Sequence, residues 1–173
     1  LFGGLWVHEH PTPERSRYLA LTLDFSPVAT DAGVDVMRRS FASVVKNALR
    51  PFLARYAARY PALGALQRQI ENHDDAAERI GTLLSIVASL DHKLYLLIDE
   101  YDNFANRLLA SGEQALHETI VGGMGFVRSF YAALKAGTRT GALARMFITG
   151  VSPILLDDLS SGFNILTHAS LWP

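Results

Sequence analysis

The sequence contains no cysteine, which removes disulfide bonds, thiolate metal sites and cysteine nucleophiles from its possible chemistry. It also lacks a large charge of either sign, because 16 lysines and arginines oppose 17 aspartates and glutamates and leave a formal net charge of −1. Such a balance gives no electrostatic footprint for nucleic acid or for an anionic membrane surface. The absence of cysteine fits a reducing compartment, so we expect a cytoplasmic protein.

No apolar run approaches the roughly 20 residues that a membrane-spanning helix needs, so we expect no membrane partner. No basic flank followed by a long apolar stretch indicates a signal peptide. The chain opens with LFGGLWV instead of a methionine and ends on the large apolar pair Leu171-Trp172 before Pro173. We therefore expect residues 1–173 to be one partial domain of a longer protein.

The stretch from Lys93 to Asp102, which reads KLYLLIDEYD, has the strongest pattern in the chain. Residues 94–98 are all apolar, and they end on two carboxylates, Asp99 and Glu100. A continuous run of this length is typical of a strand buried on both faces, as in a parallel sheet covered by helices. Ligands of such sheets bind beyond the carboxyl ends of the strands. The pattern matches a Walker B strand of a P-loop nucleoside triphosphatase.

Two further strands are predicted, over Tyr18–Phe25 (YLALTLDF) and, as a third buried strand, over Ala144–Val151 (ARMFITGV). Apolar residues at intervals of three and four predict the helices between them. These helices cover Asp31–Tyr60 with a kink or a new start at Pro51, Pro61–Ile70, Asp75–Leu90, Asn103–Ala110 and Glu113–Lys135, with capping side chains expected from Asn72-His73-Asp74 and a turn over Gly137–Gly141. Strands that alternate with helices predict an α/β fold with a parallel sheet.

Polar side chains follow all three predicted strands. Asp24 lies near the end of the first, Asp99 and Glu100 end the second, and Thr149 and Ser152 end the third within TGVS. If the strands are parallel neighbours, these groups converge on one edge of the sheet. For Asp24 we favour a simpler role, a cap on the following turn through hydrogen bonds from backbone amides.

These groups suit phosphoryl hydrolysis. A carboxylate can hold Mg²⁺ through its water shell, and Asp99 is the candidate for this metal site. Glu100 is the candidate for orienting the attacking water, and Thr149 or Ser152 for sensing the terminal phosphate. A plainer alternative stays open, since acidic residues also end buried strands because helix N-termini and loop amides attract them.

Three other features have simpler interpretations. His8 and His10 lack a third ligand and are interpreted as solvated loop residues. The glycine-rich segment at 122–125 has no Lys-Ser or Lys-Thr after it and no strand before it, so it predicts a kink or a mobile segment and not a phosphate loop. Basic residues over Arg38–Arg59 share this region with aromatic residues at helical spacing, which favours a solvated helix face over a nucleic-acid surface.

Several segments, taken in order, resemble the predicted AAA-ATPase-like family, P-loop proteins found mostly in bacteria. LYLLIDEYDNF is similar to the family's strand ending in LIDEYD, SFYAALKAG to its helix with FY-x-x-LK, and RMFITGVSPILLDDLSSGFNILTHASLWP to its TGVS strand and L-x-SGFNNLTD segment. The opening LFGGLWV and the strand LTLDFS are similar to the family's earlier segments. The resemblance covers nearly the whole chain.

The resemblance implies a three-layer P-loop sheet flanked by helices, with ATP and Mg²⁺ as ligands. Family members usually carry a Walker A strand and loop just before the LFGGLWV region, and many continue into a nuclease-like domain of the PD-(D/E)XK type. No Gly-Lys-Ser or Gly-Lys-Thr occurs here, so we expect a truncated domain that by itself binds ATP weakly or not at all. Two departures replace charged residues of the family: Asp102-Asn103 stands for Asp-Lys, and Thr167-His168 stands in the LTD segment.

The resulting hypothesis is an ATP-binding and ATP-hydrolysing P-loop domain. Asp99 would bind the metal, Glu100 and Thr149 or Ser152 would act in hydrolysis, and Asp99 and Thr149 would contact the Mg-ATP complex. The alternative is a non-hydrolysing, nucleotide-gated interaction or regulatory module. A nuclease-like neighbouring domain and the basic helix leave a link to nucleic-acid processing open as a third interpretation.

Overall fold

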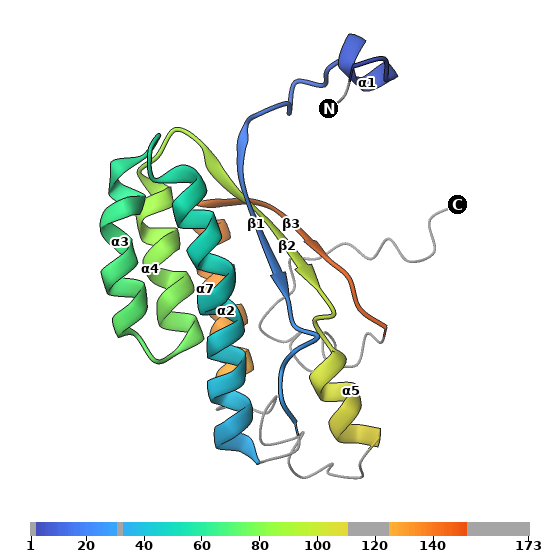
Figure 1. Ribbon diagram of the computed structural model, residues 1–173, viewed down its shortest axis with the longest axis vertical. Helices are drawn as coiled ribbons and strands as arrows, with labels where there is room; N and C mark the ends of the chain where they lie inside the picture. The colour runs from blue at the N-terminus through green and yellow to red at the C-terminus, as the bar shows by residue number, and fades with distance from the viewer. Residues whose placement is uncertain (1–2, 31–32, 111–124, 152–173) are drawn as a thin grey trace.

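Residues 3–30, 33–110 and 125–151 are described by the computed structural model, with residues 108–110 described by their backbone alone (Figure 1). The elements follow one another in alternating α/β order. They are α1 (Trp6–Glu9), β1 (Tyr18–Asp24), α2 (Val34–Tyr56), α3 (Pro61–Asn72), α4 (Ala76–Ala88), β2 (Lys93–Asp99), α5 (Asn103–Ala110), α7 (Phe126–Arg139) and β3 (Leu143–Ile148).

The three strands form a parallel sheet in the order β1-β2-β3, which confirms the predicted α/β class with a parallel sheet. β1 and β2 pair without interruption, from Tyr18 opposite Lys93 to Asp24 opposite Asp99. The pairing of β2 with β3 has one irregularity near the start of β2 and then runs to Ile98 opposite Ile148. All three strands therefore end at the same edge of the sheet.

The helices α2, α3, α4 and α7 lie together on one face of this sheet, as Figure 1 shows. The strand order explains this arrangement. Each crossover moves one strand further in the same direction, and right-handed crossovers then place both connections on the same face. Burial alternates accordingly, since Leu19, Leu21 and Leu23 of β1 are buried while Ala20 and Thr22 are exposed.

Burial on both faces, which the apolar run of β2 predicts, is wrong for the part of the chain that the structure describes. Leu94, Leu96 and Ile98 are buried, but Leu97 between them is only half-buried. The predicted third strand is also not buried, because it lies at the edge of the described sheet and Phe147 is 54% exposed. The described residues thus form two layers, and the three-layer arrangement stays a prediction.

An aromatic cluster connects the sheet to the helices beneath the ends of the strands. Phe41 of α2 stacks on Phe25, which follows β1, with ring centroids 4.6 Å apart. Phe126 and Phe130 of α7 meet Phe41 edge-on at 5.3 Å, and Phe104 of α5 meets it at 5.9 Å. Pairs of this geometry each add about 0.5–1.5 kcal/mol beyond the burial of their area. The edge where the strands end therefore rests on a closely packed base.

Prolines have different effects in two of the helices. α2 runs through Pro51 to Tyr56 as one helix, so the alternative of a new helix starting at Pro51 is wrong. α3 begins at Pro61, as predicted, where the missing N–H removes no helical hydrogen bond.

The helix before β2 is capped one residue later than predicted, because the carboxylate of Asp75 accepts from the amides of Ala77 and Glu78.

The later helices also differ in their bounds from the prediction. α5 covers the predicted range Asn103–Ala110. α7 extends to Arg139, so the predicted turn over 137–141 is shorter and begins at Thr140. The first part of the helix predicted from Glu113 falls on residues 113–124, outside the described residues.

A buried arginine joins three helices of this layer. Arg79 of α4 is only 4% exposed. Its guanidinium donates to the carbonyl oxygen of Ile70 in α3 at 3.1 Å, to that of Ala42 in α2 at 2.7 Å, and to that of His73. Burial lowers the pKa of Arg79, while Asp74 and Asp75 raise it. The charge is therefore stabilised by backbone carbonyls at a position where solvation is weak.

No helix in the described ranges combines the length and the apolar composition that crossing a bilayer requires.

Candidate functional site

The carboxyl edge of the sheet brings together the polar groups that follow its three strands. Asp24 and Asp99 are register partners on neighbouring strands, and both are exposed. Thr149 follows the last residue of β3 directly and is half-buried. Asp24, Asp99 and Thr149 therefore lie side by side, beyond the residues that the helices cover.

Asp99 and Thr149 are in direct contact. The hydroxyl of Thr149 donates to the Oδ1 atom of Asp99 and also lies 3.3 Å from the carbonyl oxygen of Ile98. The amide of Thr149 donates to the same carbonyl at 2.8 Å, so the β2–β3 pairing continues past the end of β3. The predicted metal carboxylate and one of the two predicted sensor residues are thus brought together.

Glu100 has an unusual backbone conformation for a residue with a side chain. Its φ is +53°, in the left-handed region that glycine favours, and its amide donates to Oδ1 of Asp99 at 3.1 Å. A non-glycine residue in this region costs about 1 kcal/mol or more. The conformation turns the chain sharply out of β2 and leaves the Glu100 side chain half-buried beside Asp99.

Asp24 caps the turn after β1, as predicted. Its Oδ1 atom accepts from the hydroxyl of Ser26 and, at 2.9 Å, from the amide of Ser26. The Ser26 hydroxyl, followed by the Ser26 amide, lowers the pKa of Asp24 below its usual value of 3.8, while burial opposes the shift. The carboxylate is therefore ionised at neutral pH and stands opposite Asp99 across the strands.

Two residues of this edge, Asp102 and Gly150, were not predicted as part of the site. Asp102 is 1% exposed, and its carboxylate accepts from the amide of Val151 at 3.2 Å and from the side chain of Asn106 at 2.9 Å. A Cβ atom at Gly150 would lie 2.3 Å from the ring of Tyr101. In the sequence, an aspartate just before a helix indicates only a helix cap. This local signal does not predict that Asp102 contacts Val151, which follows β3.

The oxygen groups of this edge suit a hard cation. Asp24 and Asp99 supply carboxylates and Thr149 supplies a hydroxyl, the kind of ligand that Mg²⁺ prefers. Among the described residues no group of three or more histidines, aspartates or glutamates is placed to hold a metal ion. Mg²⁺ needs no such cage, because it keeps several waters and uses one or two carboxylates together with substrate phosphates.

The remaining residues singled out in the sequence either lie away from this edge or fall outside the described residues. His8 and His10 are both exposed, as predicted, but the predicted loop is wrong for His8, which lies in α1; His10 follows this helix and stacks on Trp6 with ring centroids 4.6 Å apart. Ser152, the second sensor candidate, lies outside the described residues, as do the glycines at 122 and 123. Gly125 immediately precedes α7.

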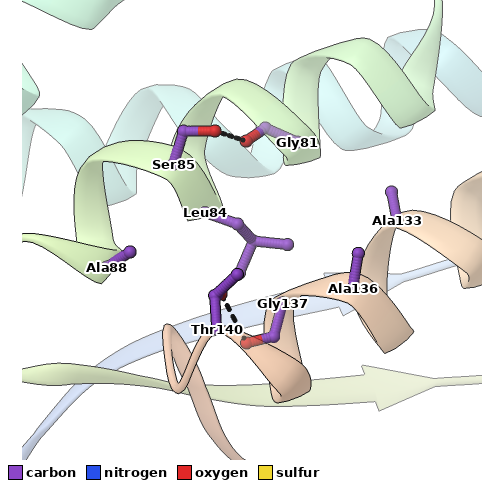
Figure 2. Close-up of a pocket in the computed structure, with 8 residues that line it drawn as sticks. All are labelled: Gly81, Leu84, Ser85, Ala88, Ala133, Ala136, Gly137 and Thr140. Atoms are coloured by element: carbon purple, nitrogen blue, oxygen red, sulfur yellow. Dashed lines mark hydrogen bonds between the residues drawn. The ribbon is translucent and has the colours of Figure 1, made fainter.

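A hollow of about 230 Å³ lies elsewhere, between α4 and α7 (Figure 2). Small side chains line it, and a Cβ atom at Gly137 would come within 2.7 Å of Leu84. Two of its lining residues shortly precede strands in the sequence: Ala88 comes before β2, and Thr140 comes before β3. The hollow is therefore at the opposite end of the sheet from the carboxylates, between two helices that approach each other closely at Gly137 and Leu84.

Comparison with known proteins identifies the family. No curated protein and no solved structure matches the chain. A family model does match, over residues 1–160, and its description is "Predicted AAA-ATPase". That range contains all three strands and every group of the carboxyl edge described above. The chain belongs to the AAA-ATPase-like family.

Proposed function

We propose that this chain supplies the Walker B and sensor edge of a Mg-ATP site in an ATP-hydrolysing protein. The observation that carries the proposal is the contact between Asp99 and Thr149, which come from neighbouring parallel strands and meet where both strands end. A crevice at the carboxyl ends of parallel strands is where open α/β sheets bind their ligands. The family's description as a predicted AAA-ATPase supports the same reaction.

Each group has a role that its position supports. Asp99 would hold Mg²⁺ through its water shell, and the ion would supply charge neutralisation to the phosphates. Glu100 would accept a hydrogen bond from the attacking water, since its turn places it immediately beyond Asp99. Thr149 would contact the terminal phosphate, with Ser152 as a second candidate. The hydrogen bond from Thr149 orients one carboxylate oxygen of Asp99.

The topology of the sheet supports a P-loop arrangement. β2, which ends in Asp99, lies between β1 and β3, and β3 forms one of the two edges of the described sheet. The resemblance to P-loop proteins places a Walker A strand beside the strand that ends in TGVS, which is on that side. The expected remaining layer would meet the face that includes Leu97 and Phe147.

The test uses the complete protein and the substitution Glu100→Gln. We expect phosphate release over many turnovers to fall about 100-fold or more, with ATP binding retained, because the amide cannot accept a proton from water. Glu9→Gln, an exposed residue of α1, is the matched control and should hydrolyse ATP at the unmutated rate. Hydrolysis by Glu100→Gln at that same rate would refute the role of Glu100.

A second candidate function is a nucleotide-gated interaction module that binds ATP without hydrolysing it. The observation that favours it is Asn103, which stands where the family tends to have lysine and donates to the carbonyl oxygen of Ser26 at 3.2 Å. A neutral amide there removes one positive charge from the edge that would face the phosphates. Nucleotide binding by the unmutated protein without phosphate release would establish this alternative.

A further inference from the structure

Three hydrogen bonds donated by backbone amides join the chain that leaves β3 to the end of β2 and the residues after it. The amide of Thr149 donates to Ile98 O at 2.8 Å, and the amide of Tyr101 donates to Thr149 O at 3.2 Å. The third bond, from the amide of Val151, ends on a side chain, the carboxylate of Asp102, at 3.2 Å. The other two acceptors are backbone carbonyl oxygens, so this is the one bond of the three whose acceptor a substitution can remove.

Asp102 is held in place from the opposite side as well. The carboxylate oxygen that does not bind Val151 accepts from the side-chain amide of Asn106 in α5 at 2.9 Å, and the backbone oxygen of Asp102 accepts from the amide of Asn106 at 2.9 Å. A carboxylate that is only 1% exposed needs such partners, because loss of its hydration is costly. Asp102 therefore forms a fixed connection between α5 and the end of β3.

Gly150 supports the same close approach independently. A Cβ atom at this position would lie 2.3 Å from the ring of Tyr101 and 2.5 Å from Oδ1 of Asp102. Tyr101 is itself only 3% exposed, so its ring has little room to move away. The segment from Thr149 to Val151 can take its position only because Gly150 has no side chain.

We propose that Asp102 is a positioning residue of the carboxyl edge, which holds the Thr149–Val151 segment against the end of β2 and so fixes Thr149 relative to Asp99 and Glu100. Asp102 is only 1% exposed, so it is not placed to touch a bound substrate. Its effect on catalysis rests on the proposed ATPase function, whereas its effect on the position of Thr149 does not.

The first test measures ATP hydrolysis by the complete protein with Asp102→Ala. We expect kcat per folded molecule to fall roughly 10- to 100-fold, with KM for ATP changed less than about threefold, because misplaced catalytic groups lower kcat more than ground-state binding. Asp102→Asn should recover kcat to within about threefold of the unmutated protein, because its amide oxygen still accepts from Val151 and Asn106 can turn its side chain over. Gly150→Ala should reproduce the effect of Asp102→Ala.

The matched control is Asn106→Ala, which removes the side-chain donor to Asp102 in α5 and leaves the bond from Val151 and the backbone bond from residue 106. It should lower the unfolding temperature and leave kcat per folded molecule unchanged. A purely structural role for Asp102 would instead make Asp102→Ala and Asn106→Ala alike in kcat. That result, or an unmutated kcat in Asp102→Ala, would overturn the proposal.

The second test is independent of ATP. Hydrogen exchange at the amides of Tyr101, Thr149 and Val151 should accelerate about tenfold or more in Asp102→Ala, relative to the amide of Leu96 in the centre of β2. Asn106→Ala should leave these ratios unchanged. If the unmutated protein does not hydrolyse ATP, the proposed function fails and this exchange measurement alone decides the role of Asp102; unchanged exchange in Asp102→Ala overturns it.

Discussion

The helical layer and the carboxyl edge of the sheet differ in how they treat polar groups. In the helical layer a buried charge, Arg79, is matched by three backbone carbonyls, and the other described buried side chains of these helices are hydrophobic. At the edge, Asp24 and Asp99 are exposed, and Glu100 has a left-handed backbone. Strained and exposed groups tend to occur at functional sites, and closely packed regions supply the stability that permits them.

The two regions meet at the aromatic cluster. Phe25 comes immediately after Asp24, and its ring is fully buried against Phe41 and Phe130. Phe104 occupies a similar position after Asp102, and it also contacts Phe41. Asp24 and Asp102 are thus each followed within two positions by a buried aromatic side chain of this cluster. The comparison predicts that substitutions in the layer change stability most and substitutions at the edge change function most.

The largest effect on stability is expected from Arg79→Met. The substitution removes the donors to Ile70, Ala42 and His73 and leaves buried carbonyl oxygens without them. We expect the free energy of unfolding to fall by about 3 kcal/mol or more, since hydrogen bonds from charged groups each contribute roughly 1.5–3 kcal/mol. Urea unfolding followed by circular dichroism measures this change.

Arg38→Met in α2 is the matched control for Arg79→Met. The Arg38 side chain is 53% exposed and lies 3.9 Å from Asp35, and such surface ion pairs contribute less than about 1 kcal/mol. If the two variants lose stability equally, the buried guanidinium does not organise the helical layer, and the contrast between layer and edge fails.

Much of this contrast can be predicted from the sequence. Continuous or alternating apolar runs predict the three strands, and the residues that follow them predict that Asp99 and Thr149 meet at one edge. The turn after β1 is equally local, because Asp24 and Ser26 are two residues apart and their hydrogen bonds depend only on the turn. These predictions succeed because each depends on neighbouring residues or on the parallel direction of the strands.

Other features depend on contacts between distant parts of the chain and could not be predicted in this way. The apolar run 94–98 suggests two covered faces, yet the described helices cover one, because coverage follows from strand order and the hand of the crossovers. Asp102 contacts Val151, which lies 49 positions away in the sequence. The positive φ of Glu100 has no sequence signal either, because asparagine or glycine is the usual residue there.

The next largest effect is expected from a pair of variants at Glu100. Glycine relieves the left-handed strain but adds freedom to the unfolded chain, so Glu100→Gly should change the free energy of unfolding by less than about 1 kcal/mol. Valine is β-branched and tolerates this conformation poorly, so Glu100→Val should be about 2 kcal/mol less stable than Glu100→Gly. Thermal unfolding compares the two directly.

Both Glu100 variants should lose ATP hydrolysis in the complete protein, because both lack the carboxylate. If Glu100→Gly is stable but inactive, the loss of hydrolysis comes from the missing carboxylate and not from a loss of stability. Equal stability of the glycine and valine variants would show that the backbone at Glu100 is not strained in solution.

The smallest effect is expected from Ser26→Ala at the same edge. Losing the hydroxyl donor should raise the pKa of Asp24 toward its usual value of 3.8, while the amide of residue 26 keeps part of the shift. A lowered pKa in the folded state adds stability above the usual value of 3.8, which the unfolded chain retains, and this stability disappears as the pH falls through the folded pKa. Ser26→Ala should therefore be less stable above about pH 4, by less than about 1 kcal/mol because Asp24 is exposed, and the difference should vanish in stronger acid.

Carbon-13 NMR titration of the Asp24 carboxyl measures the pKa of Asp24. Ser43→Ala, at an exposed serine of α2, is the control and should leave this pKa unchanged. An unchanged pKa in Ser26→Ala would mean that the turn after β1 is held by its backbone alone, and Asp24 would then be a less specific part of the edge than its contacts indicate.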